Sequence, residues 1–339
     1  MKEQLPPEAQ MMQTLGACFI SQAAYIAAKL GIADLLAEHA KPVAALAAAS
    51  ETDERSLYRV LRTLAMVGIF RETEQKVFAN TSVSETLRSD APNSLRDAAI
   101  WWGEEPHWRV YGEMLYSVRT GKAAWKRVHG QEAFPYIFET NRELGDIFNR
   151  AMTSFSGTTI PAIIEAYDFS GVGVLADVAG GHGHLLAGVL NRYPQMKGVL
   201  FDVPYVLEGA PELLEKKGVA DRVELVRGDF FESIPIAADV YMLKHIIHDW
   251  YDEQNIIIMK NIRASMHDDS RILILEMVIP EGNEPHFGKI LDLEMLVSPG
   301  GVERTETEFR ELLAASGFRL NRILPTKSMI SIVEAVKAD

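Results

Sequence analysis

Five short apolar runs in the second half of the chain constrain its fold more than any other feature of the sequence. They are VGVLADVAGG, GVLFDV, VELVRGDF, ADVYMLKHI and RILILEMVI, which begin at residues 172, 198, 223, 238 and 271. Stretches with helical spacing of apolar residues separate most of them. Buried strands that alternate with helices predict a parallel, doubly wound α/β sheet. The segment FRLNRILPTKSMISIVEAV predicts two more strands, as a hairpin at the edge of that sheet.

The first part of the chain has a different, mostly helical pattern. Residues 10–38 predict a pair of helices, and apolar residues at helical spacing predict a further helix that ends at Gly68. Ser50 and Thr52 are residue types that cap the start of such a helix well. EQKVFANT then predicts a small hairpin. Helices followed by a hairpin are typical of a winged-helix domain, for which DNA binding is one interpretation.

Length and pattern together predict more than one domain. A chain of 339 residues is long enough for about two domains. We expect a helical, winged-helix-like domain over residues 1–100, a helical and aromatic-rich segment over 101–168, and the sheet domain over 169–339.

Composition and charge exclude several classes of protein. The chain contains 34 Lys and Arg against 47 Asp and Glu, for a net charge of −13, and it has no dense basic run, so we expect no nucleic-acid partner. The single cysteine, Cys18, excludes an internal disulfide. The N-terminal residues lack the pattern of a signal peptide, and no apolar run is long enough to span a membrane. We therefore expect a cytoplasmic protein without a membrane partner.

A glycine-rich stretch, DVAGGHGHLL, follows the first predicted strand of the sheet. Gly180, Gly181 and Gly183 allow a tight turn and a close approach of the backbone to a ligand, and Asp177 lies at the carboxyl end of the strand. A dinucleotide fingerprint would require a third glycine where Leu186 stands, which argues against a nicotinamide-dependent dehydrogenase. A glycine-rich turn without function is the alternative.

Acidic residues also end the next two predicted strands. Asp202, in FDVP, has the position of a carboxylate that binds a ribose diol. Asp229 and Phe230, in RGDFFESIP, are suited to an adenine amino group and ring face. Each acid alone is also compatible with an ordinary turn. Acids at three successive strand ends together favour a nucleoside-binding edge.

LKHIIHDWYDE, residues 243–253, follows the fourth predicted strand and therefore reaches the same edge. No second cluster of His or Cys accompanies its two histidines, so we expect no metal site. His248 is the candidate general base, and for His245 we expect a packing or loop-positioning role. A base needs an acid that orients it, and Glu276 and Glu303 are candidates, although both could also be surface carboxylates or ion-pair partners.

Taken together, these motifs resemble those of the S-adenosylmethionine-dependent small-molecule O-methyltransferases, both plant and bacterial. The resemblance extends from LGIADLLAE through VRTGKAAW, FNRAM, DVAGGHGHLL, FDVP, GDFFESIP and LKHIIHDWYDE to PGGVERTETEF, which is nearly the whole chain. It implies a Rossmann-like class I methyltransferase sheet and an N-terminal winged-helix module that forms a homodimer. It also implies S-adenosylmethionine as cofactor, a small aromatic hydroxyl compound as acceptor, and no metal.

The resemblance also implies roles for individual residues. The catalytic residues would be His248, with Glu276 and Glu303 beside it. The cofactor-binding residues would be Asp177, Ala179, Gly180, Gly181, Gly183, Asp202, Val203, Gly228, Asp229, Phe230 and Lys244. The acceptor-binding residues would be Leu144, Phe148, Met152, Phe155, Met295 and Ser298.

One position departs from the family pattern. Ala179 stands where the family usually has glycine, and its methyl group would narrow the cofactor loop. Some relatives bind the same cofactor and carry out decarboxylation or hydroxylation, which is the alternative to methyl transfer. A winged-helix regulator that senses a nucleotide is a further alternative.

Overall fold

The computed structural model describes residues 5–338, apart from the side chain of Thr158. Residues 1–4, on which the expectation of no signal peptide partly rests, lie outside it. The chain forms two compact units, Met1–Gly112 with Phe134–Gly157, and Glu113–Ala133 with Thr158–Asp339. The division into three segments, residues 1–100, 101–168 and 169–339, stays a prediction.

The first unit begins with a long helix, α1 (Pro7–Lys29), which packs against α4 (Glu54–Met66) and α5 (Arg96–Gly103). The contact with α5 is close, because a Cβ atom at Gly103 would lie 2.2 Å from the Tyr25 ring. The other elements of this unit are α2 (Ile32–Leu35), α3 (Val43–Ala49), η1 (Ser84–Leu87), α6 (Glu105–Tyr111), the π-helical turn η2 (Tyr136–Thr140), and most of α9 (Ala133–Pro135) and of α10 (Arg142–Ala166).

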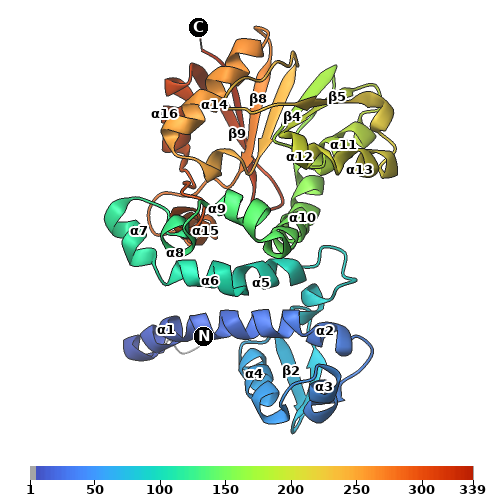
Figure 1. Cartoon of the computed structure of the whole chain (residues 1–339), viewed down its shortest axis with the longest axis vertical. Helices are drawn as coiled ribbons and strands as arrows, with labels where there is room; N and C mark the ends of the chain where they lie inside the picture. The colour runs from blue at the N-terminus through green and yellow to red at the C-terminus, as the bar shows by residue number, and fades with distance from the viewer. Residues whose placement is uncertain (1–4, 339) are drawn as a thin grey trace. The chain divides into compact units, whose positions relative to one another are not determined.

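A small antiparallel sheet lies beside these helices, with strand order β1 (Lys41–Pro42), β3 (Val77–Asn80), β2 (Phe70–Glu74) (Figure 1). The N-cap residue of α4 is Asp53, whose carboxylate accepts the N–H of Ser56 at 2.8 Å. The predicted caps Ser50 and Thr52 are therefore wrong. The hairpin after α4 is present, and the assignment to the winged-helix class stays a prediction.

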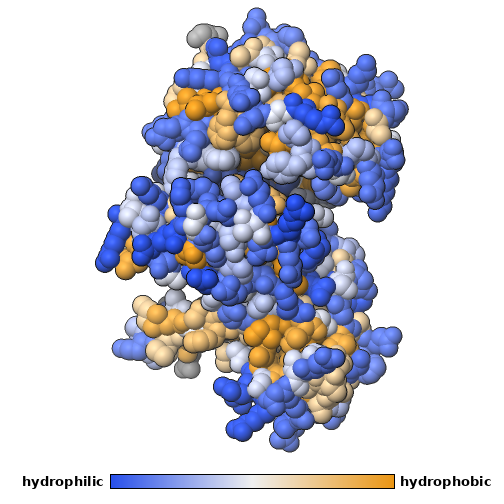
Figure 2. Space-filling model, in the orientation of Figure 1, coloured by the Kyte–Doolittle hydropathy of each residue, from blue (hydrophilic) through white to orange (hydrophobic). Residues whose placement is uncertain are grey.

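Apolar side chains on one face of α1 are exposed. Met11, Met12, Leu15 and Phe19 have exposed fractions of 58, 67, 62 and 74%. Figure 2 shows hydrophobic surface over this helix. Their spacing of three to four residues places Leu15 and Phe19 one above the other, so the chain alone leaves a hydrophobic stripe in water.

The second unit contains a seven-stranded sheet with order β6-β5-β4-β7-β8-β10-β9. The strands β4 to β8 pair in parallel, and β10 pairs antiparallel with both β8 and β9. The predicted parallel sheet and its edge hairpin are confirmed. The strands are β4 (Val174–Val178), β5 (Lys197–Asp202), β6 (Val223–Arg227), β7 (Val240–Lys244), β8 (Arg271–Glu276), β9 (Phe318–Pro325) and β10 (Ser331–Lys337).

Helices cover both faces of this sheet, as Figure 1 shows. The helices α14 (Asp252–Ser265) and α16 (Glu306–Ala315) pack on one face, and α11 (His184–Arg192), α13 (Ala210–Lys216) and the end of α10 pack on the other. Strand β8 shows why its run is apolar throughout: Ile272 and Ile274 enter one core, and Leu273 and Leu275 enter the other. The remaining elements are α7 (Met114–Thr120), α8 (Trp125–His129), α12 (Pro204–Leu207), η3 (Ala220–Arg222), η4 (Ile247–Asp249) and α15 (Gly288–Val297).

The strand order places the candidate site. The chain adds β5 and β6 on one side of β4, and then returns to add β7 and β8 on the other side. The carboxyl ends of β4 and β7 therefore meet at a topological switch point, where open α/β sheets bind ligands. Within residues 5–338, no helix has the length and apolarity that a membrane span requires.

Candidate active site

The loop after β4 is a tight turn held close to the sheet. Ala179, Gly181 and Gly183 have φ angles of +55°, +61° and +86°. At Gly180 the restriction is spatial, because a Cβ atom would lie 2.5 Å from the Asp177 carboxyl carbon and 2.6 Å from Leu200. The glycines thus allow this loop to turn tightly and to pack closely against the sheet at the end of β4.

Asp177 ends β4 below that loop and is 1% exposed. Its Oδ2 atom has no hydrogen-bond partner among the residues that the structure describes. Burial raises the pKa of this carboxyl to about 7, and the nearby Lys244 opposes the rise. Burial in turn lowers the pKa of Lys244, at the end of β7, to about 8, and Asp177 opposes that fall. A buried carboxylate oxygen without a donor fits a ligand that supplies one, such as the ammonium group of an amino acid.

Asp202 ends β5 and faces the same loop. Its Oδ2 accepts the N–H of Gly181 at 2.9 Å, and its Oδ1 accepts the N–H of Val203 at 2.7 Å. Burial raises the pKa of Asp202 to about 6, against the effect of these two hydrogen bonds. Each oxygen keeps a second lone pair, so the carboxylate is fixed in place and can still accept hydroxyl groups.

The end of β6 completes this side of the site. The N–H of Gly228 donates to the Asp202 carbonyl at 3.1 Å. The exposed Asp229 accepts the N–H of Phe231 at 2.8 Å, and the half-buried Phe230 meets Trp250 edge-on at 6.1 Å. The structure therefore brings the predicted acids of β4, β5 and β6 to one edge of the sheet.

His248 lies in the short turn after β7 and is 7% exposed. Its Nδ1 lies 2.6 Å from Oε1 of Glu303, and its backbone N–H donates to Oε1 of Glu276 at 3.0 Å. Glu276 ends β8, and Glu303 belongs to the segment between α15 and α16. Both glutamates are buried, so they are not the surface carboxylates that the sequence left open. Carboxylates from two other segments thus hold His248, Glu303 at its imidazole and Glu276 at its backbone.

The charges around His248 control its protonation. Burial lowers the pKa of the imidazole, but the carboxylates of Asp249, Glu303 and Glu276 outweigh burial and raise it to about 9. Burial raises the pKa of Glu276 to about 7 and that of Asp249 to about 6, and His248 opposes both shifts. Because Nδ1 is bonded to Glu303, a neutral His248 presents its lone pair at Nε2.

Two residues of this arrangement were not among those predicted from the sequence. Asp249 places Oδ1 at 3.6 Å from Nε2 of His248, and its position directly after the histidine was the available signal. Gly301 lies so close to the turn that a Cβ atom there would be 1.7 Å from the His248 carbonyl oxygen. The two adjacent glycines in PGGVER were the signal for this close approach.

His245 differs from His248 although only two residues separate them. It has φ +55°, and its Nδ1 has no hydrogen-bond partner among the described residues. Burial lowers its pKa well below the usual value, and the cations Lys244 and His248 add to the effect. This imidazole is neutral, and its predicted packing or loop-positioning role stays a prediction.

The predicted acceptor residues belong to both units. In the second unit, Met295 and Ser298 are buried around the end of α15. In the first unit, Leu144 is buried, Phe148 packs on Trp101, and Phe155 packs on Trp102. Met152 is half-buried in the same helix, α10. The acceptor wall as a whole stays a prediction.

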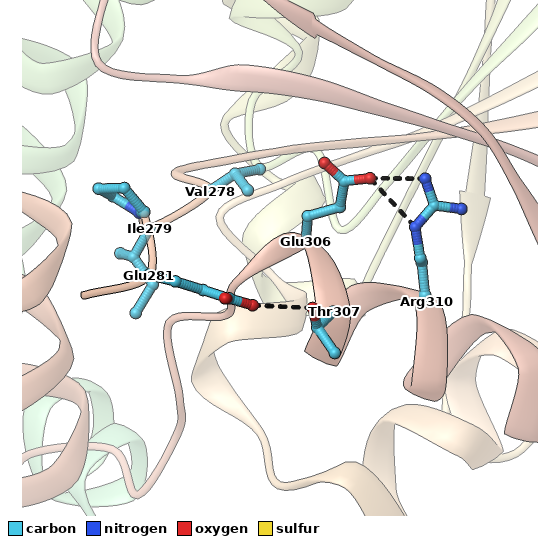
Figure 3. A pocket seen from close by; sticks show the side chains of 7 residues that line it. Val278, Ile279, Glu281, Glu306, Thr307 and Arg310 are labelled. Carbon is cyan, nitrogen blue, oxygen red and sulfur yellow. Dashed lines mark hydrogen bonds and ion pairs between the residues drawn. The ribbon is translucent and has the colours of Figure 1, made fainter.

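A cavity of about 330 Å³ lies elsewhere on the second unit, at the start of α16 (Figure 3). An ion pair between Glu306 and Arg310 and a hydrogen bond from Thr307 to Glu281 border it, as the dashed lines in Figure 3 show. None of the predicted site residues lines this cavity. Over residues 5–338, no three His, Cys, Asp or Glu side chains gather as metal ligands would.

Comparison with known proteins identifies the family. The family model described as an O-methyltransferase domain matches residues 111–319, and the one described as an O-methyltransferase dimerisation domain matches residues 12–90. The phenazine O-methyltransferase of Lysobacter antibioticus is 43% identical, over 98% of this chain and 96% of that protein. The mitomycin biosynthesis 6-O-methyltransferase of Streptomyces lavendulae is 39% identical, over 94% and 91%.

A solved structure adds the cofactor. An O-methyltransferase from neocarzinostatin biosynthesis, in complex with S-adenosylmethionine and 2-hydroxy-5-methyl naphthoic acid, matches with a TM-score of 0.80 and 29% identity, over 94% of this chain and 96% of that chain. The chain therefore belongs to the S-adenosylmethionine-dependent O-methyltransferases of the kind that tailor natural products.

Proposed function

We propose that this enzyme methylates a hydroxyl group of a small aromatic molecule and that His248 is the general base. The observation that carries the proposal is the contact of 2.6 Å between Nδ1 of His248 and the buried Glu303, with Glu276 on the backbone of the same residue. When a carboxylate fixes one nitrogen of a buried imidazole, the other nitrogen is held in one orientation and can accept a proton from a bound substrate.

The chemistry explains why a base is needed. When bound, S-adenosylmethionine would supply an electrophilic methyl group to the acceptor oxygen, and the S–CH3 bond would break to leave S-adenosylhomocysteine. A phenol with a pKa near 10 is only about one part in a thousand ionised at pH 7, and the neutral hydroxyl is a poor nucleophile. We propose that Nε2 of His248 takes the hydroxyl proton, and that Glu303 and Glu276 stabilise the resulting imidazolium. A base of this kind contributes about 10²- to 10⁴-fold to the rate.

The residues at the sheet edge fit the cofactor. The unpartnered Oδ2 of Asp177 would accept the ammonium group of the methionine part, and the loop from Ala179 to Gly183 would lie around that part. Asp202, held by the N–H groups of Gly181 and Val203, would accept the ribose hydroxyls. The adenine would be bound by the remaining predicted cofactor residues, which are Gly228, Asp229 and Phe230, with Lys244 near the cofactor.

Relatives support an aromatic acceptor. The names of two relatives refer to phenazine and mitomycin, and a third was solved with a hydroxylated naphthoic acid. Phe148 and Phe155 lie in aromatic clusters with Trp101 and Trp102, which would suit a flat, apolar compound. We propose a fused or substituted aromatic hydroxyl compound as the substrate class.

We also propose a homodimer, which the dimerisation domain over residues 12–90 supports. The stripe formed by Met11, Met12, Leu15 and Phe19 is the surface that we expect a second copy to cover. A two-fold interface of this kind buries the same apolar stripe from both copies.

The first prediction concerns His248→Ala. We expect turnover with a panel of phenols and fused aromatic hydroxyl compounds to fall by about 10²-fold or more, because the hydroxyl proton has no acceptor. Binding of S-adenosylmethionine should stay nearly unchanged, since His248 is not one of the predicted cofactor-binding residues. The measurement is transfer of a labelled methyl group with mass spectrometry of the products, alongside calorimetry of cofactor binding. Unchanged turnover in the variant would exclude His248 as the base.

A further inference from the structure

Arg304 directly follows Glu303 and is buried, with 2% of its surface exposed. Its Nη1 donates to the carbonyl oxygens of Ile247 and Val302, both at 3.1 Å, and its Nη2 donates to that of Trp250 at 3.1 Å. A guanidinium is kept inside a protein only where its N–H groups find acceptors. Two of these three carbonyls, those of Ile247 and Trp250, belong to the turn that carries His248.

Asn255, from α14, reaches the same turn from another direction. It is fully buried, and its Nδ2 donates to the carbonyl of Ile247 at 2.8 Å and to that of Trp250 at 2.9 Å. Each of these two carbonyls therefore accepts one hydrogen bond from Asn255 and one from Arg304. The two carbonyls flank His248 and Asp249, so the backbone on both sides of the imidazole is fixed twice.

The carbonyl of His248, which lies between these two, also accepts a hydrogen bond. The N–H of Val302 donates to the His248 carbonyl at 2.8 Å, and Gly301 packs against that oxygen. One short segment, residues 301–304, thus holds the backbone of His248 through its neighbours and the imidazole through Glu303.

We propose that Arg304 is a positioning residue for the methyl transfer. It does not reach the reacting atoms, and it acts by fixing the turn from Ile247 to Trp250 so that Nε2 of His248 points at the acceptor. The inference rests on the proposed role of His248 as the base. Arginine suits this place because it donates from three nitrogens at once: Nη1 to Ile247 and Val302, Nη2 to Trp250 and Asp252, and Nε to Asp252. Lysine has a single nitrogen with three hydrogens and cannot replace all of these bonds.

Asp252 has a lesser part in this arrangement. It accepts from Nη2 and Nε of Arg304 at 2.7 and 3.2 Å, but its side chain is 64% exposed. An exposed ion pair is screened by water, so Asp252 orients the guanidinium from outside and the carbonyls hold it from inside.

The test compares Arg304→Lys with a matched control. Arg222 likewise donates from Nη1 to three backbone carbonyls, those of Leu190, Tyr193 and Met196, at 3.1, 3.5 and 3.2 Å. These carbonyls lie at the amino ends of β4 to β6, the edge opposite His248. Arg222→Lys therefore removes similar bonds without touching the turn.

For Arg304→Lys we expect kcat to fall about 10²-fold, the effect of a small misplacement of a catalytic group. Affinity for S-adenosylmethionine should stay within about twofold of wild type. A variant that failed to fold would lose cofactor binding as well, so this measurement distinguishes a misplaced base from an unfolded protein. Arg222→Lys should keep the wild-type kcat at a comparable loss of thermal stability. Asp252→Asn should lower kcat less than Arg304→Lys does.

The same change is then made in the His248→Ala protein. If Arg304 acts through His248, Arg304→Lys should lower the residual single-turnover rate no further. A second fall of similar size in that background would show general damage and overturn the inference, as would wild-type kcat in Arg304→Lys alone. Full turnover in His248→Ala would instead refute the proposed base itself, so the two failures are distinguishable.

Discussion

At the scale of single residues, two non-glycine residues lie in the left-handed region at the edges of the site. Ala179 follows β4 and His245 follows β7, and both have φ +55°. A residue with a Cβ atom adopts this conformation only when its surroundings impose it, and such positions gather at functional sites.

Ala179→Gly should stabilise the protein. The left-handed conformation costs alanine about 1 to 2 kcal/mol, and the extra chain entropy of glycine in the unfolded state offsets part of the gain. We expect the free energy of unfolding to rise by about 0.5 to 1 kcal/mol in denaturant titrations. The control is Ala187→Gly in helix α11, which is buried and should lose stability. A loss in Ala179→Gly like that of the control would contradict the argument.

The pKa of His248 sets a pH dependence with a definite sign. Carboxylates raise this pKa to about 9, and a base acts only when it is neutral. At pH 7 only about 1% of His248 is then neutral, so kcat/KM for a neutral hydroxyl acceptor should rise about tenfold per pH unit and level off near pH 9. An acceptor that is ionised throughout the range should not show the rise.

Glu303→Gln should move that inflection to lower pH, because the variant removes one of the carboxylates that raise the pKa of His248. Profiles of kcat/KM against pH for both proteins provide the measurement. An inflection at the wild-type pH in the variant would mean that Glu303 does not control the protonation of the base.

At the scale of elements, the apolar runs predicted the strands well, whereas the ends of helices depended on contacts that spacing does not reveal. Ser50 ends α3 as its C-cap residue and donates its hydroxyl to the Leu46 carbonyl at 2.8 Å, whereas Asp53 directly precedes α4 and takes the N-cap position. By contrast, TETE at the start of α16 forms a complete capping box between Thr305 and Glu308. At α16, the residues of the first turn determine the cap by themselves. At α4, several neighbouring side chains could accept the capping hydrogen bond, and their competition determines which one does.

At the scale of the whole molecule, the chain has two units and an uncovered apolar helix face. The stripe on α1 exposes four large apolar side chains, which is unusual for a helix face in contact with water. Residues 12–90, which include most of this helix, match a dimerisation domain. Burial of such side chains against a second copy would remove them from water, with about 1.5 to 3 kcal/mol for each large side chain fully buried.

Phe19→Glu should therefore weaken the dimer. Both copies carry the change, so we expect the dissociation constant to rise about 10²-fold or more. Light scattering coupled to size-exclusion chromatography over a dilution series provides the measurement. Met66→Glu is the control, since Met66 is also 74% exposed but lies on α4. The same dissociation constant in all three proteins would exclude this face as the interface.

The sequence by itself determined the sheet, the edge at which the site lies and most of the residues at that edge. Strands that are buried on both faces must be apolar throughout, and glycines and acids at strand ends persist in the sequence as local motifs. Only the tertiary structure decided how His248 is held. Glu276 and Glu303 lie 28 and 55 residues from His248 in the chain, and Arg304 lies 57 residues from Ile247. Gly301 and Asn255 contact backbone carbonyls of the turn. A contact with a carbonyl oxygen leaves no pattern in the residues that supply it, because every residue has one.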